Sequence, residues 1–149
     1  MKLSGLEGKV RVIAMFYSHC TYACPLTIND MKRISRALPS GLRDRVGFVL
    51  VSFDPERDSP AALRKLAESE EIDSTDWLLL TGSEGDDRTL AAELGVEFEK
   101  KADGDFQHSS LIAVLDESGD IIYRHTGLNK PIGDVVNAIK KAERARRRG

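Results

Sequence analysis

Two cysteines and a small set of histidines are the residues of this chain best suited to metal or redox chemistry. Cys20 and Cys24 are its only cysteines; three residues separate them, and His19 directly precedes the first. A thiolate is both a soft metal ligand and a redox nucleophile, so this pair supports either role. The simpler alternatives are two small buried side chains or one structural disulfide. Spacing alone leaves these interpretations open.

The sequence around the cysteines predicts a strand followed by a helix. The apolar run from Val10 to Tyr17 is typical of a buried strand. Pro25 then opens a segment with helical periodicity, and proline is favoured at the first helical position because its missing N–H is not needed there. The apolar residues that recur on one face are Ile28, Met31, Ile34 and Leu38. We therefore expect Cys20 in the connecting turn and Cys24 beside the helix start, where the helix dipole favours a thiolate.

The rest of the chain alternates strands with helices and closes with a hairpin and a helix. Predicted strands cover Val46–Phe53, Trp77–Leu80 and a short edge strand at Val96–Phe98; predicted helices cover Ala61–Glu71 and Glu84–Leu94; the hairpin joins Leu111–Leu115 to Ile121–Tyr123; and the last helix starts near Ile132. A strand, a helix and a strand in this length form a right-handed unit with parallel strands. This order predicts a single thioredoxin-like α/β domain over residues 1–149, with a central mixed sheet and helices on both faces.

Among the histidines, His108 is the one that such a fold would bring to the cysteines. In a thioredoxin-like fold the loop that enters the hairpin approaches the N-terminus of the first helix, and here that loop includes His108. His19 is a weaker candidate, because neighbours at the end of a strand point to opposite sides. We expect His125 at the surface, just after the hairpin.

Two aspartates follow the second predicted strand. Asp54 ends that strand, and Asp58 directly precedes Ser59, which is a good helix cap with proline after it. Parallel strands end at the edge of a sheet where ligands usually bind, so these carboxylates could hydrogen-bond the metal loop. Capping of a turn or of a helix start is an equally good explanation for both.

Composition narrows the classes of function. The chain has 149 residues, 41% of them apolar, and a formal net charge of -2, which argues against a broad nucleic-acid footprint. The basic residues from Lys140 to Arg148 are typical of a solvated helix face. No apolar stretch is long enough to span a membrane, and no signal peptide is visible at the start. Composition and net charge are compatible both with a cytoplasmic protein and with a soluble piece whose targeting segment was removed.

Three segments together resemble the Sco/SenC family. They are Ser-His-Cys-Thr-Tyr-Ala-Cys-Pro at residues 18–25, Val-Ser-Phe-Asp-Pro-Glu-Arg-Asp-Ser-Pro at residues 51–60, and His-Ser at residues 108–109 before an apolar strand. They resemble the family patterns T-H-C-x-x-x-C-P, a strand-ending D-P-x-x-D and a late histidine, in the same order. Two features depart from the family: the residues before Val10 are too few for its usual N-terminal hairpin, and Thr-Tyr-Ala stands where Pro-Asp-Val is frequent.

The resemblance implies a thioredoxin-like copper protein that helps to mature the copper centre of cytochrome c oxidase. Copper ligands would be Cys20, Cys24 and His108, with Asp54 and Asp58 as supporting residues. The implied partner is the copper subunit of cytochrome c oxidase or another copper or thiol protein, with no nucleic acid. The implied location is periplasmic or facing a membrane, although the family's anchor is absent here and a cytoplasmic location stays open.

Three activities are compatible with these residues. Two thiolates and one imidazole suit copper(I), and they leave an open position through which the ion could pass to a partner, whereas a structural zinc site normally has a fourth ligand. Cys20 and Cys24 could instead act as the redox pair of a general thiol–disulfide oxidoreductase. A thioredoxin-like peroxidase is the third alternative, but no arginine adjoins either cysteine.

Overall fold

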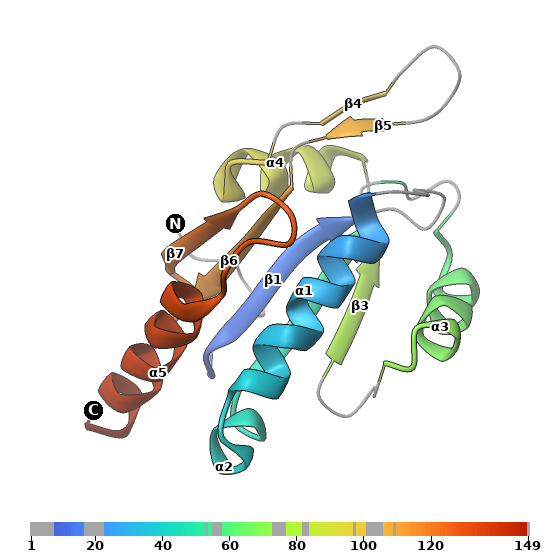
Figure 1. Cartoon of the computed structure of the whole chain (residues 1–149). Helices are drawn as coiled ribbons and strands as arrows, with labels where there is room; N and C mark the ends of the chain where they lie inside the picture. The colour runs from blue at the N-terminus through green and yellow to red at the C-terminus, as the bar shows by residue number, and fades with distance from the viewer. Residues whose placement is uncertain are drawn as a thin grey trace.

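Figure 1 shows the computed structural model of the chain, which describes residues 8–16, 23–52, 54, 58–72, 77–81, 84–96, 98–100, 106–108 and 110–148. Within these ranges, the side chains of residues 23–25, 84, 85, 87, 98–100, 106–108 and 146–148 are outside the description. The predicted mixed sheet with helices is confirmed.

Five strands form the central sheet in the order β3-β2-β1-β6-β7. The strands are β1 (Arg11–Phe16), β2 (Gly47–Ser52), β3 (Trp77–Thr81), β6 (Leu111–Leu115) and β7 (Ile121–Thr126). β1, β2 and β3 are parallel to one another, whereas β6 is antiparallel to β1 and β7 is antiparallel to β6. β1 and β2 are buried along almost their whole length, as expected when helices cover both faces of a sheet.

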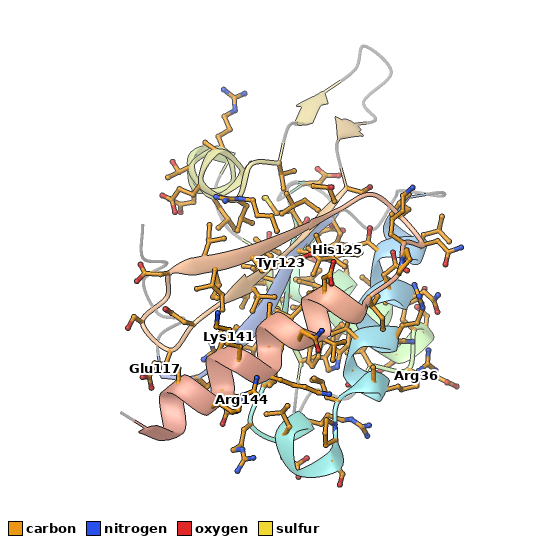
Figure 2. All side chains as sticks on the ribbon, turned by 60° about the vertical axis from the view of Figure 1, so that its left-hand side comes forward. Arg36, Glu117, Tyr123, His125, Lys141 and Arg144 are labelled. Atoms are coloured by element: carbon orange, nitrogen blue, oxygen red, sulfur yellow. The ribbon has the colours of Figure 1, made fainter. Side chains whose placement is uncertain are left out.

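Helices cover both faces of this sheet. α1 (Ala23–Ala37), α3 (Pro60–Ser69) and α5 (Gly133–Arg148) lie on one face, and α4 (Glu84–Leu94) lies on the other (Figures 1 and 2). Strand β7 has side chains on both faces of the sheet, because alternate residues of a strand point to opposite faces. Tyr123 and His125 turn toward α5, whereas Arg124 donates from Nε to the carbonyl oxygen of Leu94 at the end of α4, at 2.9 Å.

The hydrophobic core lies between the sheet and these helices. The predicted stripe of α1 is confirmed: Ile28, Met31, Ile34 and Leu38 are all at most 2% exposed. On α5 the predicted inward residues are Val135, Val136, Ile139 and Ala142, of which the first three are buried and the last is partly buried. Beside β3, the ring of Trp77 stacks on that of Phe48 with centroids 4.9 Å apart.

Several element boundaries differ from the sequence prediction. α1 begins at Ala23, so Pro25 is its third residue and not its first. The first-turn N–H groups of a helix have no intrahelical partner, so proline is tolerated throughout that turn and does not mark the start uniquely. A short helix, α2 (Ser40–Arg43), follows Pro39 where we predicted only a turn.

The segment predicted as a loop before the hairpin contains a second, smaller sheet. β4 (Phe98–Lys100) and β5 (Phe106–His108) pair antiparallel, with Phe98 opposite His108. The edge strand predicted at Val96–Phe98 is therefore displaced, and Val96 precedes it. Strands of three residues are too short to show the alternation of apolar and polar residues by which a strand is recognised in a sequence.

Candidate metal and thiol site

The carboxyl ends of the three parallel strands meet at one edge of the sheet. Phe16 of β1 is in register with Ser52 of β2, and Ser52 is in register with Thr81 of β3. The antiparallel strand β6 starts at the same edge, since Ile112 pairs with Ala14 near the end of β1. Ligand sites of open α/β sheets lie at such edges.

Cys24 lies in the first turn of α1, as the second residue of that helix. α1 is the next element after β1, and its N-terminus is at this edge of the sheet (Figure 1). The first-turn N–H groups and the positive end of the helix dipole both stabilise an anion there. Cys20 and His19 lie outside the described residues, as does the side chain of Cys24, so the predicted pair of sulfurs stays a prediction.

The backbone of His108, which is remote from the cysteines in sequence, lies near the same edge of the sheet. His108 is the last residue of β5 and stands three positions before Leu111, where β6 begins beside the end of β1. Three residues of extended chain span at most about 10 Å, so the backbone of His108 is within about that distance of this edge. Its side chain is outside the description, and its contact with the cysteines stays a prediction.

Asp54 and Asp58 form a buried network with the last residue of β2. The hydroxyl of Ser52 donates to Oδ2 of Asp58 at 2.5 Å and accepts the backbone N–H of Asp54 at 3.0 Å. The backbone N–H of Asp58 donates to the carbonyl oxygen of Asp54 at 2.9 Å. Asp58 is 0% and Asp54 2% exposed. The two aspartates thus lie together at the candidate edge, and their contacts organise the turn between β2 and α3.

Comparison with known proteins identifies the family. The model of the SCO1/SenC family matches residues 2–144. The chain belongs to the SCO1/SenC family. The Sco/SenC resemblance drawn from the three short segments is therefore confirmed, and it extends over nearly the whole chain.

Relatives within this family share both the sequence and the fold. The SCO1 protein homolog of Bacillus subtilis is 27% identical over 146 residues, which are 95% of this chain and 75% of the relative. The structure of Bradyrhizobium japonicum ScoI with copper bound has a TM-score of 0.74 at 26% identity, covering 92% of this chain and 87% of ScoI. BsSco, a member of the Sco family of cytochrome c oxidase assembly proteins in which a disulfide switch was identified, has a TM-score of 0.79 at 23% identity, covering 94% and 83%. At that identity BsSco supports the thioredoxin-like fold alone.

Ser52 is the residue that sequence reasoning missed in this SCO1/SenC chain. Its hydroxyl joins the two aspartates, and it is 0% exposed. The available signal was a polar residue at the end of an otherwise apolar strand, two positions before an aspartate. A buried hydroxyl needs a partner, so a serine in that position predicts a hydrogen bond with the turn that follows.

The prediction that His125 lies at the surface was wrong. β7 runs on to Thr126, three residues beyond the predicted end, and His125 is a buried residue of that strand, 7% exposed. It pairs with Ile112 of β6. Its Nε2 is shielded from solvent and has no hydrogen-bond partner within the described part of the chain. Burial follows from strand alternation, which turns every second residue of β7 toward α5.

The side chains described here do not by themselves form a metal cluster. Within the described residues, no group of three or more histidine, cysteine, aspartate or glutamate side chains is placed to hold an ion. In the same part of the chain, no helix has the length and apolarity needed to cross a membrane. Cys20, Cys24 and His108 remain the donor set whose chemistry fits copper(I), with two soft sulfurs and one imidazole.

Proposed function

We propose that this SCO1/SenC protein binds one copper(I) ion through Cys20, Cys24 and His108, and delivers copper to the copper site of cytochrome c oxidase or reduces that site. The supporting observation is that the first turn of α1 and the start of β6, three residues after His108, lie at one sheet edge (Figure 1), in a family whose member ScoI has been solved with copper bound. The ion is cargo in this proposal.

Each element of the edge has a chemical task in this proposal. The unpaired N–H groups in the first turn of α1 stabilise thiolate at Cys24, and thiolate is the form that binds copper(I). Asp54 and Asp58 hold the turn after β2 beside the end of β1, which leads to Cys20. Three protein ligands leave one position open for a thiol or imidazole of the recipient.

Copper(I) titration of the reduced protein tests the ligand set. We expect one ion per chain, measured under anaerobic conditions in competition with a coloured copper(I) chelator. The substitution His108→Ala should weaken binding at least tenfold, because removal of one of three donors leaves two-coordinate copper. Since both thiols must lose their protons, affinity should fall as the pH is lowered.

His19→Ala is the matched control, because it removes an imidazole that directly adjoins Cys20. It should change copper affinity less than threefold while His108→Ala changes it strongly. Equal affinity of His108→Ala and wild type would remove His108 from the site. A large loss in His19→Ala would assign the imidazole ligand to His19.

A thiol–disulfide activity of the same cysteines is the second candidate, favoured by the thioredoxin-like frame, in which Cys24 lies in the first turn of α1. The two thiols would reduce a partner disulfide by exchange: the partner gains two thiols, and Cys20 and Cys24 become a disulfide. We expect a reversible two-electron transition in glutathione redox buffers, abolished by Cys24→Ser and unaffected by His108→Ala. Since copper requires the dithiol, the oxidised protein should not bind copper(I). An unchanged transition in Cys24→Ser would contradict the assignment.

The recipient and the location follow from the family resemblance. We propose the copper subunit of cytochrome c oxidase, or another copper or thiol protein, as the partner, and a periplasmic or membrane-facing location. Fractionation of cells that produce the protein from its own gene tests the location. Recovery in the cytoplasmic fraction would contradict it.

A further inference from the structure

Strand β3 is an edge of the sheet that lacks the usual protection against pairing. No strand within the described residues pairs with its outer side. Its five residues are Trp-Leu-Leu-Leu-Thr, and Leu78 and Leu80 are 43% and 38% exposed. Exposed edges of natural sheets are normally protected by charged residues, proline or bulges, because unpaired backbone groups invite another strand. β3 contains none of these.

The opposite edge of the same sheet provides a contrast. β7 carries Arg124 within the strand, and its register with β6 is irregular between Val114 and Leu115. Ile122 is its large exposed apolar residue, at 42%. β7 thus shows the devices that discourage pairing, and β3 does not. Of the two edges, β3 is therefore the less protected against pairing with another strand.

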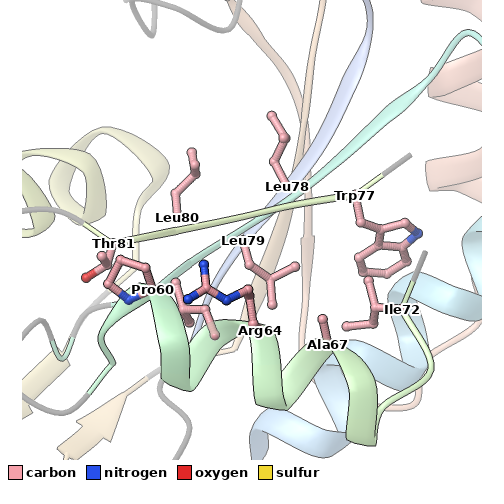
Figure 3. A pocket seen from close by; sticks show the side chains of 10 residues that line it. Pro60, Arg64, Ala67, Ile72, Trp77, Leu78, Leu79, Leu80 and Thr81 are labelled. Atoms are coloured by element: carbon pink, nitrogen blue, oxygen red, sulfur yellow. The ribbon is translucent and has the colours of Figure 1, made fainter. Parts of the chain in front are cut away.

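A groove beside β3 extends the apolar surface of this edge. It lies between β3 and α3 and has a volume of about 460 Å³ (Figure 3). Trp77 and Leu79 turn toward α3, while Leu78 and Leu80 turn to the other face of the sheet. The helical side of the groove is formed by Pro60, Leu63, Ala67 and Ile72. A strand added to β3 would therefore find apolar surface for its side chains on both faces.

The groove leads to the candidate copper edge. Thr81, at the carboxyl end of β3, lines the groove and is in register with Ser52 of the aspartate network. Pro60, at the other wall, follows Asp58 by two residues. A partner segment bound along β3 would therefore bring its adjoining residues to the edge where Cys24 lies.

The charge of the sequence that forms the groove and its neighbouring elements favours one kind of partner. Residues 60–94, which comprise α3, β3 and α4, contain nine Asp and Glu but three Lys and Arg, a net charge of −6 in a chain whose total is -2. Glu68 and Glu71 are exposed at the end of α3. Arg64 lines the groove and is exposed, so its guanidinium can donate to the carbonyl oxygens of an added strand. An acidic segment favours a basic partner and disfavours a second copy of this chain, because the two acidic segments would repel each other.

We propose that β3 and this groove are the docking surface for an extended segment of a partner protein, apolar at alternate positions and flanked by Lys or Arg. The segment pairs with the β3 backbone, places alternate side chains against the groove, and presents the partner's acceptor residues to the copper edge. Its role in copper transfer rests on the proposed function above; docking itself does not require copper.

A peptide-binding measurement on the metal-free, reduced protein tests the docking surface. The probe is the blocked peptide Lys-Lys-Thr-Val-Thr-Val-Thr-Lys-Lys, and Trp77, the single tryptophan of the chain, reports binding through its fluorescence. We expect a saturable change and hydrogen-exchange protection of the β3 amides. The substitution Leu80→Lys should weaken binding at least tenfold. Ile122→Lys, the same change of charge on the other edge, should leave it unchanged.

The outcomes separate the docking surface from the copper site. Binding that is unaltered by Leu80→Lys, or equally strong with Glu in place of the flanking Lys, would overturn the proposal. A concentration-dependent dimer abolished by Leu80→Lys would overturn it as well, by making a second copy the occupant. Because the assay contains no copper, His108→Ala should bind the peptide normally. A wild-type protein that binds the peptide but does not bind copper(I) would contradict the proposed function and leave the docking surface intact.

Discussion

At the scale of single residues, the hydroxyl of Ser52 links two aspartates whose roles the sequence left undecided. Both carboxylates are buried, and Asp58 accepts a short hydrogen bond from Ser52. A buried carboxylate is costly unless it is hydrogen-bonded, so the network must be largely complete for the fold to tolerate it. Organisation of the turn after β2 is the role that these contacts establish. A direct effect on the metal loop stays a prediction.

Removal of this hydroxyl should destabilise the protein measurably. We expect Ser52→Ala to lower the free energy of unfolding by about 1–3 kcal/mol, because a buried charged acceptor loses a donor. Urea denaturation measures the change. The double variant Ser52→Ala, Asp58→Ala should lose less stability than the sum of the losses in the two single variants, since each change removes the same contact.

Ser69→Ala is the matched control for that measurement. The hydroxyl of Ser69 also donates a hydrogen bond, to the carbonyl oxygen of Leu66, but it lies at the exposed end of α3. Its removal should cost less than about 0.5 kcal/mol, as surface substitutions usually do. Equal losses in the two variants would mean that the Ser52 network contributes no more than an exposed contact.

At the scale of elements, a carboxylate ties the helix that carries Cys24 to the loop before α5. Asp30 of α1 is 1% exposed; its Oδ2 accepts the backbone N–H of Asn129 at 2.8 Å, and its Oδ1 is 2.9 Å from Nη1 of Arg33. Asn129 has a φ of 54°, a left-handed conformation that asparagine tolerates. The tie joins residues 99 positions apart, so it holds α1 in place against the end of the chain.

Asp30→Ala should loosen this connection between α1 and the β7–α5 loop. The loop N–H of Asn129 would lose its acceptor, and we expect a loss of about 1–3 kcal/mol in the free energy of unfolding. Asn129→Gly keeps both the N–H and the left-handed backbone, so it should be nearly neutral. A loss in Asn129→Gly as large as in Asp30→Ala would show that the asparagine side chain, and not the tie to Asp30, stabilises the loop.

At the scale of the whole molecule, charge is divided between regions of the chain. Residues 60–94 are strongly acidic, whereas the second half of α5 is rich in Lys and Arg. The acidic part includes the open edge at β3, whereas the basic part lies on α5, which packs on β6 and β7 toward the opposite edge of the sheet. An approaching basic partner is therefore attracted to one side of the molecule and repelled from the other, which orients it toward β3.

Salt should weaken this orientation. At about 1 M ionic strength the screening length falls to roughly 3 Å, so long-range attraction to the acidic side is lost. We expect the association rate of the Lys-flanked peptide to fall at least tenfold between low and high salt, measured by stopped-flow fluorescence of Trp77. The dissociation rate should change far less, because it depends on backbone pairing and apolar contact. A rate independent of salt would contradict electrostatic steering.

The sequence by itself determined the order and type of the main elements, the fold, the family, and the position of the cysteine pair between the first strand and the first helix. These depend on local patterns: apolar runs, helical periodicity, proline positions and short motifs, all read within one or two turns of chain. Gly95, as the predicted end of α4, is one such local signal, and its φ of 87° confirms it.

Only the tertiary structure decided the burial of His125, the β4–β5 pairing, the Ser52–Asp58 hydrogen bond and the open edge at β3. Each of these features depends on which distant segment packs against a given residue. The pattern of apolar and polar residues around that residue does not identify the distant segment. The sequence predicted, from the expected fold, that His108 lies near the start of α1. The structure places only its backbone, through the pairing of β6 with β1. Contacts between residues remote in sequence are set by packing and strand order, and for that reason coordinates were needed to assign them.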